Sequence, residues 1–408
     1  MPKTLLILLC FPIIGFGQKV DKLKVFLDCS WNCDYDFLQR EMSYIDFFRD
    51  AKSVNLHIIV KGETGNSRGE IVTFRFIGIE EFEGVNNKLV LDVPVNTSGA
   101  VKRDLYLEVL EKGVYAYVIR TKANDVVTLS YSDKEADIKV IKKDKWNNWA
   151  FQTSIGGYFN GEESYSNSNS DMRLSANRIT EESKFKSSFS INSSISKYKF
   201  QTEPDVTIKS KSKYVGMTYV KSKSEHFSIG AIANYSQSTF YNYDGSYKLS
   251  PCIEYNIFPY AESSEHRLSL LYGISANHND YTDTTVYLKI SENFASHLFE
   301  LTYHNTQTWG GFALSINGNQ ILEKNDLKKY NVRISSDVDW NISKGLSLYY
   351  YAYINFDRGQ IHLPLYEATY EEIILRQKEL ESNYFYYLSF GISYTFGSMK
   401  NNVVNPRF

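Results

Sequence analysis

The chain has 408 residues and a formal net charge of −2, and 15% of its residues are aromatic, with 32 Tyr and 25 Phe. A charge so close to zero excludes the broad basic field of most nucleic-acid-binding proteins, so we expect no nucleic-acid partner. The length allows two or three domains, and the aromatic excess calls for a structural explanation.

The first 17 residues, MPKTLLILLCFPIIGFG, have the pattern of a secretory signal peptide. A positive charge precedes a short apolar core, and Gly15 and Gly17 occupy the small positions before the cleavage site. A buried first strand or helix is the weaker alternative. A lipid anchor on Cys10 is weaker still, because Leu9 is too large for the preceding position. No later apolar run reaches the ~18 residues of a transmembrane helix.

Residues 18–145 alternate between strand and helix patterns, which predicts a small α/β domain with a split βαβ-like order. The first helix is predicted from Asp34 to about Asp50, because apolar side chains recur there every three or four residues. A second helix is predicted to begin at Thr97 or Ser98 and to be closed by Gly113. Strands are predicted at 23–28, 54–62, 70–78, 88–93 and 126–131.

Cys29 and Cys33 form a close pair, whereas Cys252 stands alone. In an exported protein such a pair favours a structural disulfide. Free thiols are the first alternative, and redox chemistry is the second, because that chemistry prefers two intervening residues to three. No further Cys pair or His cluster lies nearby to complete a zinc shell, so no metal site is predicted.

In residues 146–408 the helical spacing disappears and long segments alternate between apolar and polar side chains. In the segment 329–343, for example, Val332 and Ile334 share one face, and Arg333 and Asp337 share the other. Twelve such segments are predicted, near 149–160, 170–179, 184–198, 207–222, 226–240, 246–260, 266–277, 285–304, 310–321, 329–343, 346–361 and 383–397, with 278–297 the weakest region.

These segments are about twice as long as strands of soluble sandwiches, and several reach the ~9–11 residues of a membrane-spanning strand. We therefore expect an antiparallel transmembrane β-barrel of about 12 strands, closed because backbone groups in hydrocarbon must be paired. Its partner on the apolar face is outer-membrane lipid, and the Tyr and Phe at the segment ends match the aromatic girdles of such barrels. The polar face would line the lumen.

An even strand count places the leading domain and the C-terminus on one side of the membrane, which we expect to be the periplasm. Short links at 221–225, 261–265, 305–310 and 343–345 alternate with longer ones at 161–169, 199–206, 278–284, 322–328 and 362–382, as short periplasmic turns and long outer loops would. The loop 362–382 predicts a surface helix that packs on the barrel rim, with a ligand-gating lid as the alternative.

The last predicted strand places Tyr394 and Phe396 on its apolar face, and the chain ends at Phe408. A final aromatic after an aromatic strand is typical of the C-terminal signal that outer-membrane assembly machinery reads. We therefore expect these three residues to form the barrel-assembly signal and that machinery to be a partner.

The closing segment, LPLYEATYEEIILRQKELESNYFYYLSFGISYTFGSMKNNVVNPRF, resembles the end of an outer-membrane β-barrel family of Bacteroidota-type bacteria. Members of that family close with an LP…AT-x-EE-I-L-L-R stretch followed by SYTFGS…NNVVNPRF. The segment VFLDCSWNCDYDFLQREMSYIDFFRD is similar to their leader domain, and Met399-Lys400 is the main departure. The resemblance implies an outer-membrane location with a periplasmic leading domain, and it implies no activity.

Catalytic, cofactor and metal motifs are absent from the sequence, so we expect no enzyme and no cofactor. His266 and His297 are the weak candidates for a membrane lipid-modifying site, which would need a Ser nucleophile and a His base. Charged residues on the polar faces predict either a salt-bridged, filled lumen or a narrow charge-selective pore, with the filled lumen favoured. These lumen charges are Glu254, Arg333, Asp337, Asp339 and Asp357.

The sequence thus predicts a non-enzymatic outer-membrane protein whose periplasmic domain, residues 19–145 after removal of the signal, is a partner-binding or docking domain for a periplasmic protein. A narrow small-solute channel is the first alternative, and a lipid-modifying enzyme is the second.

Overall fold

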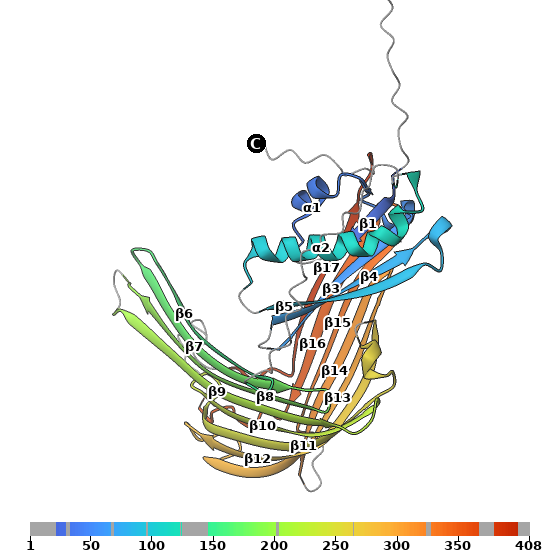
Figure 1. Ribbon diagram of the computed structural model, residues 1–408. Coiled ribbons are helices and arrows are strands. Elements are labelled where there is room, and N and C mark those ends of the chain that lie inside the picture. Colours follow the sequence, from blue (N-terminus) through green and yellow to red (C-terminus); the bar gives the residue numbers. More distant parts are fainter. Residues whose placement is uncertain are drawn as a thin grey trace, which may run out of the picture.

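The computed structural model describes residues 22–29, 33–66, 69–94, 97–122, 124, 146–200, 204–263, 265–323, 328–366 and 379–398. Within them, a small mixed α/β unit precedes a twelve-stranded antiparallel sheet, so the predicted fold class is confirmed. Figure 1 shows the α/β unit over the concave side of the large sheet. The predicted signal peptide at 1–17 and the predicted strand at 126–131 lie outside the described residues. None of the described helices is long and apolar enough to cross a bilayer.

The α/β unit is built on a contiguous βαβ motif. β1 (Lys24–Asp28) pairs in parallel with β3 (Leu56–Asn66), and α1 (Tyr35–Glu41) lies between them in the chain. β4 (Gly69–Gly78) and β5 (Asn86–Pro94) extend the sheet on one side and β2 (Asp46–Phe47) on the other, in the order β2-β1-β3-β4-β5. β1 and β3 are direct neighbours in the sheet, whereas a split βαβ arrangement would place another strand between them.

The first helix is shorter than the sequence predicted. Asp34 caps α1, as expected, by accepting a hydrogen bond from the Phe37 N–H at 3.1 Å, but the helix ends at Glu41 and not near Asp50. The residues that follow leave the helix to form β2, because the Asp46 N–H donates to the Leu23 carbonyl at 2.8 Å. Pairing with β1 therefore overrides the local helical spacing.

The second helix, α2 (Gly99–Val118), starts at the predicted Ser98 cap but runs through Gly113, which was predicted to close it. Gly113 has a packing role instead. A Cβ at this position would lie 1.8 Å from the ring of Phe76 in β4. The glycine thus lets the helix lie directly on the sheet.

The core of the α/β unit lies between this helix and one face of the five-stranded sheet. Tyr106 and Tyr117 of α2 are almost fully buried and contact Phe74 and Phe82 edge to face, with ring centroids 5.2 and 5.5 Å apart. The opposite face of the sheet is left free of α2, and this face meets the large sheet.

The large sheet is a meander in which each strand pairs with the next one in sequence. All twelve predicted segments are strands, and the described residues between 282 and 290 add no further strand. The strands are β6 (Trp149–Gly161), β7 (Tyr165–Ile179), β8 (Ser183–Tyr198), β9 (Val206–Ser222), β10 (Phe227–Ser238), β11 (Tyr243–Asn256), β12 (His266–Tyr281), β13 (Ser291–Gln307), β14 (Gly310–Leu322), β15 (Tyr330–Ser343), β16 (Leu346–Arg358) and β17 (Tyr384–Tyr394).

The two faces of this sheet have opposite chemistry. On the convex face, alternate apolar side chains are exposed, such as Ile253 at 49% and Phe390 at 70%. On the concave face, Ser250, Ser275 and Ser296 of three neighbouring strands are fully buried, and the first two hydroxyls are hydrogen-bonded at 2.7 Å. Polar groups inside and apolar groups outside are the reverse of a water-soluble fold.

The sheet differs from the expected cylinder in one respect, since its edge strands are not joined. Among the described residues β17 pairs with β16 and β6 pairs with β7, and no ladder links β6 to β17. Figure 1 shows the green strands β6–β9 diverging from the red strand β17. β3 reaches β7 across the concave side, so the α/β unit occupies space between the two margins of the sheet.

The connections define two ends of the large sheet. The near end carries 180–182, 223–226, 257–265, 308–309 and 344–345, and the far end carries 162–164, 199–205, 239–242, 282–290, 323–329 and 359–383. β6 begins and β17 finishes at the near end, as the even strand count requires. Far-end connections are mostly longer, as predicted, with two corrections. The 162–164 turn is short because β7 begins at Tyr165, and 257–265 is long because it contains the short helix η4 (Tyr260–Glu262).

Candidate functional site: a polar concave face covered at both ends

The near end is covered by the free face of the α/β sheet. Ile59 of β3 is only 4% exposed although it points away from the α/β core, because it lies against the concave wall beside Gly311 and Asp339. The same face carries Lys61 and Arg75, which alternate with buried core residues along β3 and β4. The free face therefore presents apolar side chains, among them Ile59 and Phe26, next to the cations Lys61 and Arg75.

Arg75 joins two near-end segments of the large sheet. Its guanidinium lies 3.3 Å from the Glu265 carboxylate and donates to the Thr306 carbonyl at 3.1 Å. Lys88 of β5 lies 3.8 Å from the same carboxylate. Lys52 adds a third point by donating to the Ile342 carbonyl at 2.6 Å. These polar contacts fix the orientation of the α/β unit on the rim.

Lys61 reaches further, onto the concave wall itself. Its ammonium group hydrogen-bonds to the His304 ring and donates to the Thr306 hydroxyl at 2.8 Å. Burial lowers the pKa of Lys61 to about 8; Glu63 opposes this shift and Arg75 adds to it. Lys61 is therefore still mostly charged at neutral pH, but its charge is partly desolvated by the docking of the α/β unit.

Two cavities remain behind this contact. One, of about 370 Å³, is lined by Lys61, Arg267, His304 and Asp337. The other, of about 710 Å³, is lined by Arg267, Glu254 and serine side chains of β9 and β10. Charged side chains line both cavities together with apolar ones, such as Leu314 in the first and Leu271 in the second.

The five predicted lumen charges all lie on the concave side, but the structure does not gather them into one site. Glu254 and Asp337 line the two cavities, and Asp339 lies where the α/β unit touches the wall. Arg333 and Asp357 lie on β15 and β16 toward the far end. Of the five, only Glu254 has an ion-pair partner in the part of the chain that the structure describes: Arg267, at 3.6 Å.

The far end is covered by the segment 359–366, which follows β16 and returns over the concave side. Asn242 donates from its amide to the His362 carbonyl at 2.9 Å, and the Val286 N–H donates to the Leu363 carbonyl at 2.9 Å. Ile361 and Leu363 are buried, and the His362 ring pairs with Glu379. The described part of the predicted loop 362–382 thus packs on the rim, while residues 367–378 lie outside the described chain.

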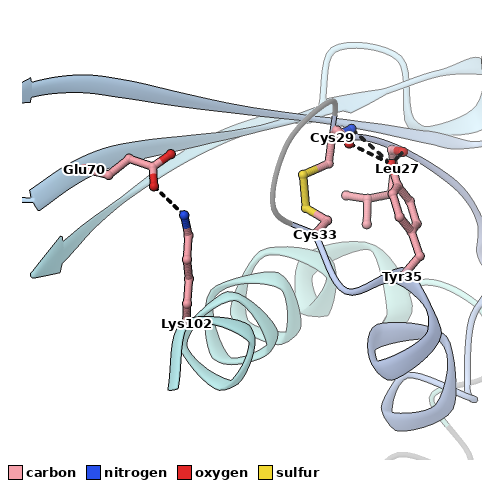
Figure 2. The surroundings of a disulfide bond; sticks show 6 residues. All are labelled: Leu27, Cys29, Cys33, Tyr35, Glu70 and Lys102. Atoms are coloured by element: carbon pink, nitrogen blue, oxygen red, sulfur yellow. Dashed lines mark hydrogen bonds and ion pairs between the residues drawn. A yellow bond between two sulfur atoms is a disulfide. The ribbon is translucent and has the colours of Figure 1, made fainter. Parts of the chain in front are cut away.

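The disulfide joins Cys29 to Cys33 and belongs to the scaffold of the α/β unit. Figure 2 shows it beside Tyr35, whose hydroxyl donates to the Leu27 carbonyl at 3.0 Å and accepts from the Cys29 N–H at 3.2 Å. Burial raises the pKa of Tyr35. In the same view Lys102 of α2 pairs with Glu70 of β4, which fastens the helix to the sheet. Cys252, by contrast, is a free thiol.

The two histidine candidates do not form a catalytic pair. His266 hydrogen-bonds to Glu262 at 2.7 Å in the near-end connection, and His297 hydrogen-bonds to the Tyr272 hydroxyl at 2.8 Å on the convex face. The register places them eight positions apart along β12, or about 26 Å. Neither ring has a serine hydroxyl as partner in the described chain, and no three described His, Cys, Asp or Glu residues are grouped as a metal site would need.

The predicted assembly signal is only partly visible. Tyr394 is the last residue of β17, and Phe396 follows with 79% of its surface exposed. Phe408 lies outside the described residues.

The docking residues Lys61, Arg75, Glu265 and His304 were not identified from the sequence. Each belongs to an alternating strand or a charged turn and looks locally like a solvent-facing residue. The one available signal was Lys61, a lysine that directly follows the apolar run LHIIV in β3.

No protein-family model matches the sequence, and no curated protein matches it. Among solved structures, the translocator domain of autotransporter NalP from Neisseria meningitidis is 10% identical with a TM-score of 0.30, covering 61% of this chain and 87% of that one. The NanC porin is 10% identical with a TM-score of 0.28, covering 60% of this chain and 99% of that one. Likeness at this level carries no argument about function.

Proposed function

We propose that the chain is a non-enzymatic outer-membrane β-barrel protein whose α/β domain docks at the periplasmic mouth of the barrel and binds a periplasmic partner. The exposed convex face is the observation that carries the proposal. On β17 alone, Leu388, Phe390 and Ile392 are each more than half exposed. Contiguous apolar surface on this scale is unfavourable in water and favourable in hydrocarbon.

The height of the apolar face supports the same environment. On the convex side of β9, Val215, Met217 and Tyr219 stand between Lys213 and Lys221. The two lysines are eight positions apart, which is about 26 Å along the strand and close to the ~25 Å apolar band of membrane barrels. This strand therefore fits a hydrocarbon layer, with one lysine at each of the two borders of the layer.

In a bilayer the edges β6 and β17 would each leave a row of unpaired backbone groups, at a cost of several kcal/mol for each group. β6 runs from the near end and β17 runs toward it, so the two are oriented for antiparallel pairing. We expect the membrane form to close through a β6–β17 ladder.

The docking geometry supports a role for the α/β domain as an adaptor. Its strand face is occupied by the contacts of Lys61 and Arg75, whereas α1 and α2 lie on the other face. The helical side therefore remains available to a periplasmic protein.

Cell fractionation tests the location. The mature protein should pellet with membranes in the absence of detergent, resist extraction by alkaline carbonate and migrate faster in gels when unheated. Recovery in the aqueous supernatant after ultracentrifugation would contradict the proposal and would require partner protein on the convex face.

A narrow solute channel is the second candidate, and the two cavities on the concave face, which charged side chains help to line, favour it. The α/β unit at the near end and the segment 359–366 at the far end cover the concave face, and these two covers favour a filled lumen instead. Planar-bilayer recordings separate the two: a filled lumen gives no stepwise current, and a channel gives current that rises when the contact of Arg75 with Glu265 is broken.

A further inference from the structure

Four lysines form a cluster on the convex face at the far end of β8 and β9. Lys209, Lys211 and Lys213 occupy alternate positions of β9, and Lys197 lies on β8, opposite Thr207. All four side chains are exposed. We call these four residues the basic patch.

The register places the basic patch outside the lumen. Lys213 shares its strand face with Met217 and Tyr219, which are 45% and 48% exposed on the convex side. Along the ladder with β8, Lys213 stands opposite Ile191 and Lys209 stands opposite Ile195. The basic patch therefore lies on the same face as the apolar surface and begins at the far-end border of that surface.

Among the described residues, no acid pairs with the charges of the basic patch. None of the four lysines has an ion pair with a described residue. The convex neighbours across the ladders are Ser193 and Gln237, both neutral. The described acids at this end of the neighbouring strands include Asp205, before β9, Glu162 and Glu163, in the turn before β7, and Asp244, which accepts a hydrogen bond from Gln237 at 3.2 Å. Four like charges at this spacing repel one another, so the arrangement favours an external anion.

We propose that the basic patch binds the phosphate groups of a membrane lipid in the leaflet at the far end of the barrel. The inference rests on the proposed membrane location, because a headgroup meets the patch only if the adjoining apolar face lies in hydrocarbon. Phosphate is the anionic group found at that height in a leaflet, and lysine ammonium groups bind it as point charges. Lys209 and Lys213 lie about 13 Å apart along the strand, a span that suits a headgroup with two phosphates.

Lipid binding to the full chain in zwitterionic micelles tests the inference. Native mass spectrometry would compare diphosphoryl lipid A with phosphatidylcholine as probes. The test variant carries Lys209→Gln, Lys211→Gln and Lys213→Gln. A matched control carries Lys184→Gln, Lys186→Gln and Lys248→Gln, which remove the same charge from the concave face of β8 and β11. Unheated gel mobility shows that each variant is folded.

We expect the test variant to lose affinity for diphosphoryl lipid A by on the order of 100-fold and the control to stay within about threefold, given the usual contribution of a lysine near an anionic surface. Arginine at the three test positions should preserve binding, which keeps the result interpretable if the glutamine variant misfolds. Unchanged affinity in the test variant, or an equal loss for phosphatidylcholine, would overturn the proposal.

A third result would also overturn it. Inorganic phosphate that binds the micellar protein with the same lysine dependence, and as tightly as the lipid, would assign the patch to a soluble anion. Micelles report this affinity whether or not the protein spans a bilayer. Failure of the lipid-binding inference is thus distinct from failure of the membrane location, which fractionation reports.

Discussion

Replacement of Glu265 by Gln should release the α/β unit from the near end of the large sheet. Glu265 forms ion pairs with both Arg75, at 3.3 Å, and Lys88, at 3.8 Å, and it belongs to the connection before β12. The substitution keeps the size of the side chain and removes only its charge, so the change isolates the electrostatic part of docking.

The magnitude follows from distance and exposure. At 3.3 Å an ion pair in partly screened surroundings is worth about 5 kcal/mol before desolvation. The side chains of Arg75 and Glu265 are 15% and 29% exposed, so solvent screens the pair incompletely and part of that energy is lost on desolvation. Lys88 is 41% exposed and should contribute about 0.3–0.5 kcal/mol. We expect a total loss of about 1.5–2.5 kcal/mol.

Urea unfolding of the full chain in micelles measures this loss. Circular dichroism at 222 nm follows α2, the longest described helix, which lies in the α/β unit. We expect the large sheet to stay folded to higher urea. Glu262→Gln is the matched control, because Glu262 lies in the same connection but pairs with His266 and not with the α/β unit.

A double-mutant cycle with Arg75→Gln decides the interpretation. If Glu265→Gln costs less than about 0.3 kcal/mol, or if the two substitutions are strictly additive, Arg75 and Glu265 do not couple and the docking geometry is refuted.

Three further predictions concern other parts of the molecule. Burial lowers the pKa of Lys61 from 10.5 to about 8, so the docked state binds fewer protons than the undocked state. Docking of the α/β unit should therefore be weakest below pH 8. Its free energy should become more favourable by about 1 kcal/mol between pH 7 and 9. Lys61→Met should abolish that difference in urea unfolding, and the same pH dependence in both proteins would count against it. Gly113→Ala places a methyl group into the ring of Phe76 and should destabilise the α/β unit by about 1–3 kcal/mol in the same assay, whereas a neutral result would mean the helix can shift away. Leu388→Lys on the convex face of β17 should cost about 2–4 kcal/mol in unfolding from lipid vesicles, and Ser389→Lys on the concave face should cost less than 1; equal costs would contradict the assignment of the faces.

The large sheet could be predicted from sequence because its signal is local and repeated. In the segment 329–343, apolar residues such as Val332 and Ile334 recur at every second position over more residues than a soluble strand needs, and β15 spans Tyr330–Ser343. The face on which Arg333 and Asp337 lie follows from the same alternation. Strand number and the inward or outward direction of side chains are therefore encoded within each segment.

Features that depend on distant residues could not be predicted in this way. The helical spacing near Ile45 is real, but pairing of Asp46 with Leu23 ends α1 early. Gly113 has the residue type of a helix end, and only the ring of Phe76 shows why it lies inside α2.

The covers of the concave face depend on still longer separations. Lys61 meets His304 more than 200 residues further along the chain, and Asn242 meets His362 across the far rim. The alternation of residues within a single strand gives no information about such contacts. The lumen charges were placed on the correct face for a local reason, whereas their pairing, as in Glu254 with Arg267, required the three-dimensional register.

A spin-label scan of β11 in lipid vesicles tests whether lipid covers the convex face of the large sheet. Nitroxides would be placed singly at positions 249, 250, 253 and 255 in a Cys252→Ser background, and at the native Cys252 itself; Leu249, Ile253 and Tyr255 are about half exposed, and Ser250 is buried. If lipid covers this face, labels at 249, 253 and 255 are relaxed by oxygen and shielded from a water-soluble nickel chelate, while labels at 250 and 252 show no such preference for oxygen. Free access of the nickel chelate to 249, 253 and 255 would place that face in water and rule out a lipid environment.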